Sequence, residues 1–326
     1  MTPPFLPDIA AFPLVPSSTS ESEREIAVLR SLGRFEFMQF SWIKALHYPD
    51  RAMSTAYYAL GRLEENGLVW RVAGPPTVKQ KGVVGAPRVY GLTHDGLAYL
   101  DTIGAEGDSG TLERMKSRDR KNLKVPRTTL THDLQAAWWC ALLTNSVRRS
   151  RRLRDIYIQV EYTTDRQRLD ALVILRFWRT VPKVISDTET QWNIPWWNPA
   201  GVNPQQTVQV AVALEIDRGT EPLKILLGKG VTYRDLTKAG YYEAQIGVPV
   251  TPVFLVPTVK RGAQIMTEWK DAWPDNTGVI TTSKSAIHDR WGTLWGQYRR
   301  MADGKPTSLL GSLGCPSIDA WEEGWV

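Results

Sequence analysis

The chain has 326 residues, of which 42% are hydrophobic and 23% charged, and its formal net charge is +6. This composition is typical of a globular protein with apolar material for two cores, so it excludes wholesale disorder and favours two domains. The longest apolar stretches, 207–216 and 251–257, are far shorter than the roughly 20 residues of a membrane span.

Other classes are excluded by motifs that the sequence lacks. Cys140 and Cys315 are far apart and have no C-x-x-C partner, which argues against a disulfide framework or a zinc knuckle. The four histidines form no His-x-His pair, and there is no Walker loop, dinucleotide fingerprint or Gly-x-Ser-x-Gly elbow. We expect a soluble, cytoplasmic protein with no membrane partner. Its net positive charge favours a polyanionic binding partner.

The first hundred residues predict three helices and a hairpin after a flexible leader, 1–20. Ile26, Leu29 and Leu32 recur at helical spacing and predict a helix over 21–32. A second helix is expected over 36–46, and Pro49 breaks the chain before a third, 51–66. Strand-like segments at 68–72 and 88–92 then flank a basic loop, which predicts a β-hairpin.

This order resembles the winged helix-turn-helix of bacterial regulators. The resemblance covers residues 21–100 and rests on L-x-x-L-E-E-N-G-L-V at 60–69 and Y-G-L-T-x-x-G at 90–96. It implies a domain over 21–103 that binds double-stranded DNA with its third helix in the major groove and its wing on phosphate. The candidate DNA contacts are Arg51, Ser54, Thr55, Tyr58 and Arg62 of the helix, and Lys79, Lys81 and Arg88 of the wing. The alternative is a protein-interaction module whose basic residues are only solvated.

Residues 104–127 read as a basic linker. Its second half, 113–127, has seven lysines and arginines against Glu113 and Asp119. Such a run is either a solvated face or an attraction for phosphate that weakens with salt, and we favour phosphate contact.

The remainder predicts an α/β domain over 128–300, followed by a flexible tail, 301–326. A helix over 131–150 precedes strands at 156–162, 169–177 and 208–216. A helix at 221–242, a strand at 253–256, a helix at 263–273 and a strand at 278–281 follow. The order is α-β-β-β-α-β and then α-β, with a tryptophan-bearing insertion at 182–206.

Three acidic residues lie at the ends of predicted strands, where catalytic or metal-binding side chains are expected. Asp170 opens one strand, and Glu215 and Asp217 close the next. Residues two apart on a strand share a face, so these carboxylates can converge with Asp170 on one side of the sheet. An all-oxygen set of this kind favours Mg²⁺ or Mn²⁺ as cofactor. Glu161, near another strand end, is a weaker ligand candidate.

This arrangement looks like the PD-(D/E)XK nuclease fold, an α+β or α/β domain with a mixed central sheet, in which bound metal activates water for attack on a phosphodiester. That pattern has lysine two residues after the glutamate, and here the position is Asp217. Lys224 or Lys229 on the following helix can replace it, and Arg218 can stabilise the anionic transition state. His132 is a candidate ligand or proton-transfer group.

The motifs in this order are also similar to the replication-relaxation family. They are the winged helix, His-Asp-Leu at 132–134, Leu-Asp-Ala at 169–171 and Glu-Ile-Asp-Arg-Gly-Thr at 215–220. The family is associated with plasmids and mobile elements. The resemblance implies metal-dependent nicking or cleavage of DNA during replication, relaxation or mobilisation, with other replication or mobilisation proteins as partners. Winged helices commonly pair, so a homodimer is compatible with it, although no coiled-coil heptad indicates one.

Two other interpretations stay open. The protein is a non-catalytic replication accessory or regulator if no lysine replaces the one absent at 217, and it is an interaction protein if it does not bind DNA. His132 at a helix start then caps the helix, and Glu215 and Asp217 anchor Arg218 or the basic run 148–154 in a structural network.

Overall fold

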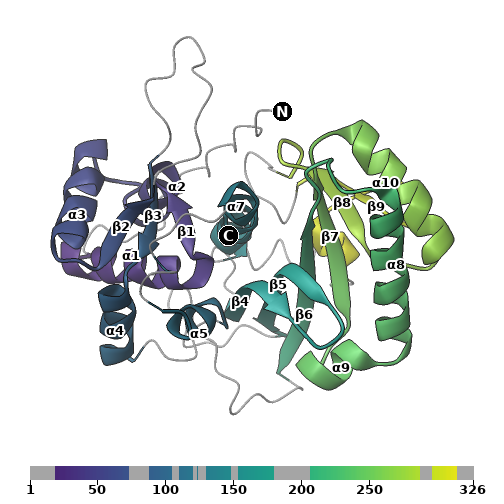
Figure 1. Cartoon of the computed structure of the whole chain (residues 1–326), viewed down its shortest axis with the longest axis horizontal. Helices are drawn as coiled ribbons and strands as arrows, with labels where there is room; N and C mark the ends of the chain where they lie inside the picture. The colour runs from purple at the N-terminus through teal and green to yellow at the C-terminus, as the bar shows by residue number, and fades with distance from the viewer. Residues whose placement is uncertain are drawn as a thin grey trace, which may run out of the picture.

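The computed structural model is a mixed α+β protein and describes residues 19–72, 88–104, 110–119, 123, 130–147, 153–179, 206–286 and 296–313. An N-terminal unit of helices around a small sheet lies on one side, and a seven-stranded sheet lies on the other (Figure 1). Helix α7 lies between them (Figure 1). No described helix is both long and apolar enough to cross a membrane.

The N-terminal unit contains the three predicted helices and the hairpin. Its elements are α1 (Glu21–Phe35), β1 (Phe37–Gln39), α2 (Phe40–His47), α3 (Met53–Glu65), β2 (Val69–Val72), β3 (Val89–Leu92), α4 (His94–Thr102) and α5 (Gly110–Lys116). Ser20 starts α1 by accepting the Glu23 N–H, and the Glu23 side chain accepts the Ser20 N–H in return. The strands form an antiparallel sheet in the order β1-β3-β2. The second helix, expected over 36–46, begins only at Phe40, because residues 37–39 form β1 and pair with β3, which local periodicity does not encode.

The second part follows the predicted order of elements. They are α7 (Leu130–Val147), β4 (Leu153–Thr163), β5 (Arg168–Trp178), β6 (Thr207–Ile216), α8 (Leu223–Lys238), α9 (Tyr241–Ile246), β7 (Val250–Val256), α10 (Val259–Ala272), β8 (Val279–Thr282), β9 (Tyr298–Arg300), β10 (Pro306–Thr307) and α11 (Leu309–Ser312). The sheet order is β10-β9-β8-β7-β6-β5-β4. Strands β6, β7 and β8 are parallel, since helices connect them, and the other neighbours are antiparallel.

The two sides of the large sheet are covered differently. Helices α8 and α10 pack on one face, where Leu226, Tyr233, Ile265 and Trp269 meet Phe254 of β7. Helix α7 covers the other face, and all of its residues except Thr131 and His132 are buried. A helix that is apolar around its whole circumference is buried on all sides.

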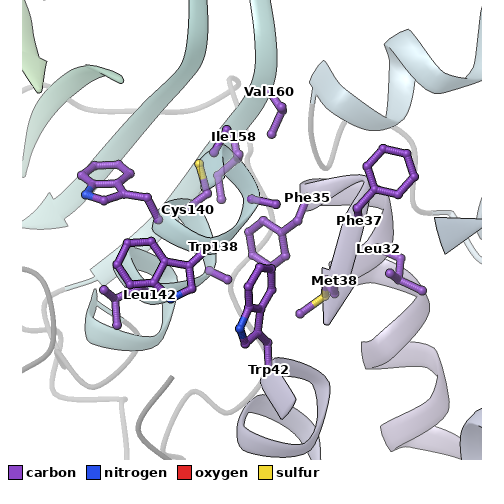
Figure 2. Close-up of a cluster of buried hydrophobic side chains, with 14 of the residues drawn as sticks. Leu32, Phe35, Phe37, Met38, Trp42, Trp138, Cys140, Leu142, Ile158 and Val160 are labelled. Carbon is purple, nitrogen blue, oxygen red and sulfur yellow. The ribbon is translucent and has the colours of Figure 1, made fainter. Parts of the chain in front are cut away.

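One hydrophobic core therefore joins the N-terminal unit to the sheet. Figure 2 shows Trp138 of α7 in one cluster with Ile158 of β4 and with Phe35 and Trp42 of the N-terminal unit. Two separate cores were expected from the sequence, but the same cluster contains residues of α1, α2, α7 and the sheet. The apolar run of α7 needs partners on both of its sides, and this requirement brings the two parts together.

Three expected segments differ from the structure. The expected linker contains α5, whose Leu112 and Met115 are buried. The helix expected over 221–242 is divided at Gly240, which has a positive φ of 64° between α8 and α9. Residues 301–313 were expected to belong to a flexible tail, but β10 extends the sheet and Leu309 is buried. The wing loop with Lys79 and Lys81, the run 148–152 and the insertion 182–205 lie outside the described residues.

Candidate functional site

The register of β5 and β6 brings two predicted carboxylates together. Ala171 lies opposite Leu214, so the next position along the pair places Asp170 opposite Glu215. Directly opposed residues of an antiparallel pair share a face of the sheet. Asp170 also accepts the N–H of Ile216 through Oδ2 at 2.6 Å, which holds its carboxylate against the end of β6.

Helix α8 supplies the partners of Glu215, a residue that is only 1% exposed. Lys229 Nζ donates to Glu215 Oε2 at 2.9 Å, and the Tyr233 hydroxyl donates to Oε1 at 2.9 Å. The two donors are four residues apart and so lie on one face of α8. Sequence reasoning missed Tyr233, which this spacing from a candidate lysine could have revealed.

The charges of these groups depend on burial and on each other. Burial raises the pKa of Glu215 to about 7, with the nearby Asp170 carboxylate adding to the effect and the Lys229 ammonium opposing it. Burial works against the Lys229 ammonium, but the carboxylates of Glu215 and Asp170 outweigh it and raise the pKa of Lys229. Lys229 therefore carries its positive charge beside the two carboxylates.

His132 reaches the same place from the start of α7. Its Nε2 lies 3.2 Å from Asp170 Oδ1, and its Nδ1 lies 3.6 Å from Asp133 Oδ1. Burial opposes protonation, but the nearby carboxylates of Asp133 and Asp170 outweigh it and raise the pKa of His132 to about 9. A protonated imidazole donates from both nitrogens and cannot bind a cation, so in this state His132 is a donor to Asp170.

The third predicted carboxylate, Asp217, is engaged elsewhere. It is buried, and its oxygens accept Arg261 Nε at 2.6 Å and Nη2 at 3.2 Å from α10. Lys224 is exposed on α8, and Lys229 is the lysine of that helix that contacts Glu215. Within the described part of the chain, no three His, Cys, Asp or Glu side chains are arranged to hold a metal ion. The structure thus brings together a pair of carboxylates, Asp170 and Glu215.

A sequence model of the replication-relaxation family matches residues 29–251, more than half of the chain. The chain belongs to the replication-relaxation family. The match includes α3 of the N-terminal unit as well as His132, Asp170, Glu215 and Lys229. No curated protein and no solved structure matches the chain.

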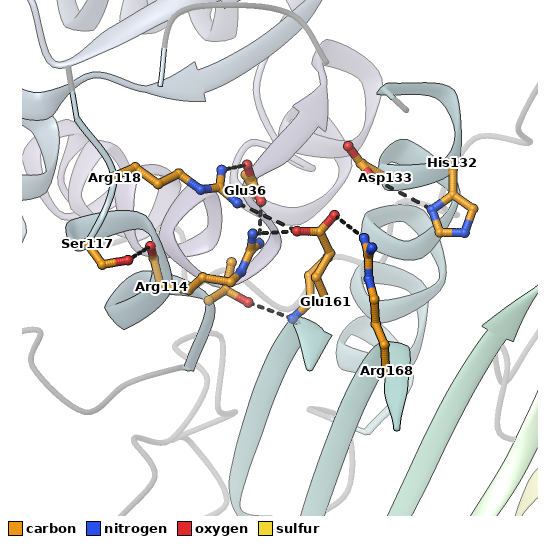
Figure 3. A network of polar contacts seen from close by, with 10 residues as sticks. Glu36, Arg114, Ser117, Arg118, His132, Asp133, Glu161 and Arg168 are labelled. Carbon is orange, nitrogen blue, oxygen red and sulfur yellow. Dashed lines mark hydrogen bonds and ion pairs between the residues drawn. The ribbon is translucent and has the colours of Figure 1, made fainter. Parts of the chain in front are cut away.

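Glu161 of this replication-relaxation protein belongs to a different cluster, shown in Figure 3. Arg114 of α5 donates to Glu36 and, at 2.6 Å, to Glu161, and Arg118 pairs with the same two carboxylates. Arg168 also donates to Glu161 at 3.0 Å. The described arginines of the expected linker therefore pair with acidic side chains, which competes with the phosphate contact expected from the sequence. We call Glu36, Arg114, Arg118 and Glu161 the linking network, because it joins the N-terminal unit to β4.

The predicted DNA contacts on α3 differ in availability. Tyr58 is 73% exposed, and Ser54 and Arg51 are also exposed, whereas Thr55 is half-buried. Arg62 is exposed but donates to Glu25 of α1 at 2.5 Å, so its charge is already paired.

At the base of the wing, the Arg88 guanidinium lies 4.8 Å from the Tyr57 ring centroid, and Tyr57 stacks on Phe40 at 3.8 Å. Sequence reasoning missed Met53 and Tyr57, two exposed apolar side chains on the same helix.

Proposed function

We propose that this protein binds duplex DNA through a winged helix over 21–103 and nicks or cleaves DNA in a metal-dependent reaction at Asp170 and Glu215. The element that encodes it is a plasmid, phage or integrative element, and the reaction serves replication, relaxation or mobilisation. One observation carries the proposal: Lys229 Nζ lies 2.9 Å from Glu215 Oε2. It supplies from α8 the lysine that the PD-(D/E)XK pattern has two residues after the glutamate, where this chain has Asp217.

The two carboxylates fit a divalent cation. Carboxylate oxygens are the ligands that Mg²⁺ and Mn²⁺ prefer, and each oxygen that accepts one hydrogen bond retains a further lone pair. The raised pKa of buried Glu215 shows that negative charge is disfavoured there, and a cation would offset this. Asp170 and Glu215 would hold the ion, which supplies Lewis-acid activation of water and of the phosphoryl oxygen.

The other side chains of the site orient the Asp170 and Glu215 carboxylates and offset their negative charge. Lys229 keeps Glu215 in place and has N–H donors for the attacking water and for the charge that develops on phosphate. Tyr233 fixes the second oxygen of Glu215, and His132 holds Asp170 from the opposite helix. These donors are already positioned, so no reorganisation is needed during the reaction.

The N-terminal unit supports DNA binding by its order of elements. Helices α1, α2 and α3 are followed by the β2–β3 hairpin, and β1 completes a three-stranded sheet, as in a winged helix. Helix α3 presents Ser54 and Tyr58 to solvent, Arg51 is exposed two residues before the helix begins, and an α-helix fits the width of the major groove.

A second candidate is a non-catalytic replication accessory. The observation that favours it is that both oxygens of Asp170 and of Glu215 already have partners, while Asp217 pairs with Arg261. Such a site needs no metal for its own stability.

Nicking of supercoiled plasmid that carries the element's own DNA separates these functions. We expect open circles with Mg²⁺ or Mn²⁺, none with EDTA, and loss of nicking in Asp170→Asn and Glu215→Gln. Glu243→Gln, which changes an exposed glutamate on α9, is the matched control and should nick normally. Duplex binding without nicking by the wild type would leave the accessory function, and nicking that survives Glu215→Gln would place the chemistry elsewhere.

A further inference from the structure

Three exposed cations lie in the segments that follow the parallel strands β6 and β7. Arg218 lies in the loop after β6, Lys224 in the first turn of α8, and Lys260 in the first turn of α10. Among the residues that the structure describes, none of the three forms an ion pair with an acidic side chain. We call these residues the cation rim.

Arg261 determines where the cation rim lies. Its guanidinium binds the Asp217 carboxylate and also donates to the backbone carbonyl of Glu221. Arg218 follows Asp217 directly, Lys224 lies three residues after Glu221, and Lys260 precedes Arg261. The three cations therefore gather around one ion pair, where the loop after β6 meets the starts of α8 and α10 (Figure 1).

The acidic residues of this edge are neutralised from within. Asp217 pairs with Arg261, and Glu221 lies 3.4 Å from Lys229 Nζ. The rim thus retains its positive charge and faces solvent. The same Lys229 also contacts Glu215, so a single side chain separates this edge from the candidate carboxylates.

We propose that the cation rim binds the sugar-phosphate backbone of the nucleic acid and aligns it over Asp170 and Glu215, an inference that rests on the proposed function. The two carboxylates by themselves repel a phosphate, so a strand that approaches them needs positive charge close by. Exposed, flexible lysine and arginine side chains bind phosphate without regard to sequence. The rim is therefore separate from the sequence-reading surface on α3.

A pair of double variants tests the rim. Lys224→Gln with Lys260→Gln removes two rim charges, and Lys238→Gln with Lys270→Gln removes two exposed charges from the other ends of the same helices. The dissociation constant for duplex carrying the element's DNA is measured by fluorescence anisotropy from about 50 to about 200 mM salt. Each phosphate contact contributes about 0.9 to the slope of log affinity against log salt, so we expect the rim variant to lose about 1.8.

The control variant should keep the wild-type slope, and adding Arg218→Gln to the rim variant should remove about 0.9 more. Thermal melting of both double variants checks that folding is unchanged, as expected for exposed side chains. Equal slopes in the rim and control variants, in a protein whose wild type binds DNA, would overturn the rim and leave the proposed function intact. A wild type that binds no DNA overturns the proposed function itself. Competition by poly-glutamate as effective as by DNA of equal charge would identify an acidic protein surface as the partner instead.

Discussion

Among the residues that the structure describes, two clusters of charged side chains differ in composition. In the linking network, Glu36 and Glu161 each contact both Arg114 and Arg118. In the other, which we call the edge cluster (His132, Asp170, Glu215, Lys229 and Tyr233), two carboxylates lie opposite each other on adjacent strands.

Opposite charges that hold elements together have a structural explanation. The two carboxylates of the edge cluster cost free energy that Lys229 and the protonated His132 offset, and a bound cation or a reaction is a further reason for placing them side by side. The comparison therefore separates a cluster that joins two parts of the fold from one suited to chemistry.

The largest expected effect is on Lys229. Lys229→Met should lower the nicking rate by about a hundredfold or more, because it removes a donor positioned for the phosphate and water. Steady-state nicking measures this, with Lys229→Arg expected to recover part of the rate. Lys229→Met combined with Glu215→Gln removes the buried charge that lost its partner and should regain stability without regaining activity. If Lys229→Met nicks DNA at the wild-type rate, the edge cluster is no better suited to chemistry than the linking network.

Glu36 tests the linking network. The Glu36 side chain is 3% exposed and pairs with two arginines, so Glu36→Gln should lower the free energy of unfolding by about 3 kcal/mol. Urea unfolding measures the loss. Nicking per folded molecule should stay near the wild-type value, since no atom of this network touches Asp170 or Glu215. A hundredfold loss of nicking in well-folded Glu36→Gln would contradict the structural role.

The edge cluster should make stability depend on pH in metal-free buffer. The pKa of His132 is raised from 6.5 to about 9, so its contribution is complete below about pH 6.5 and is lost as pH rises to about 9. The pKa of Glu215 is raised from 4.5 to about 7, so the folded state binds a proton that the unfolded state releases. Its contribution therefore also declines as pH rises, between about 4.5 and 7.

Urea unfolding at several pH values separates the two groups. His132→Asn should remove the decline above about pH 6.5, and Glu215→Gln should remove the decline below about pH 7. A pH profile that neither substitution changes would mean that the edge cluster does not carry these shifted charges.

The smallest effect is expected for an ion pair outside both clusters. Arg62 is half-exposed and pairs with Glu25, so Arg62→Ala should change the free energy of unfolding by less than about 1 kcal/mol. Duplex affinity should also change little, because the Arg62 guanidinium donates to Glu25 at 2.5 Å. The Arg51 guanidinium lies 3.6 Å from Asp50 and is held less closely, so Arg51→Ala should weaken binding. Anisotropy titrations of both variants give the comparison, and a larger loss for Arg62→Ala would show that the pair opens on DNA.

The sequence predicted much of the edge cluster and none of the linking network. Alternation along β6 predicted that Glu215 and Asp217 share a face, and a neighbouring strand was expected to bring Asp170 beside them. The structure brings Asp170 to Glu215, whereas Asp217 pairs with Arg261. The spacing after β6 offered Lys224 and Lys229 as substitutes for the missing lysine. Helical periodicity could not choose between them, because the choice depends on how α8 packs on the sheet. The linking network depends on α5 docking against both Glu36 and Glu161, which no local pattern encodes.

Local chemistry in the sequence was sufficient for the order of helices and strands and for the two carboxylates, because the periods of 3.6 and 2 are properties of neighbouring residues. Only the tertiary structure decided that Asp217 pairs with Arg261, that Lys229 rather than Lys224 contacts Glu215, and that α7 unites both parts in one core. These outcomes depend on contacts between segments distant in sequence, where packing and charge compensation determine the partners.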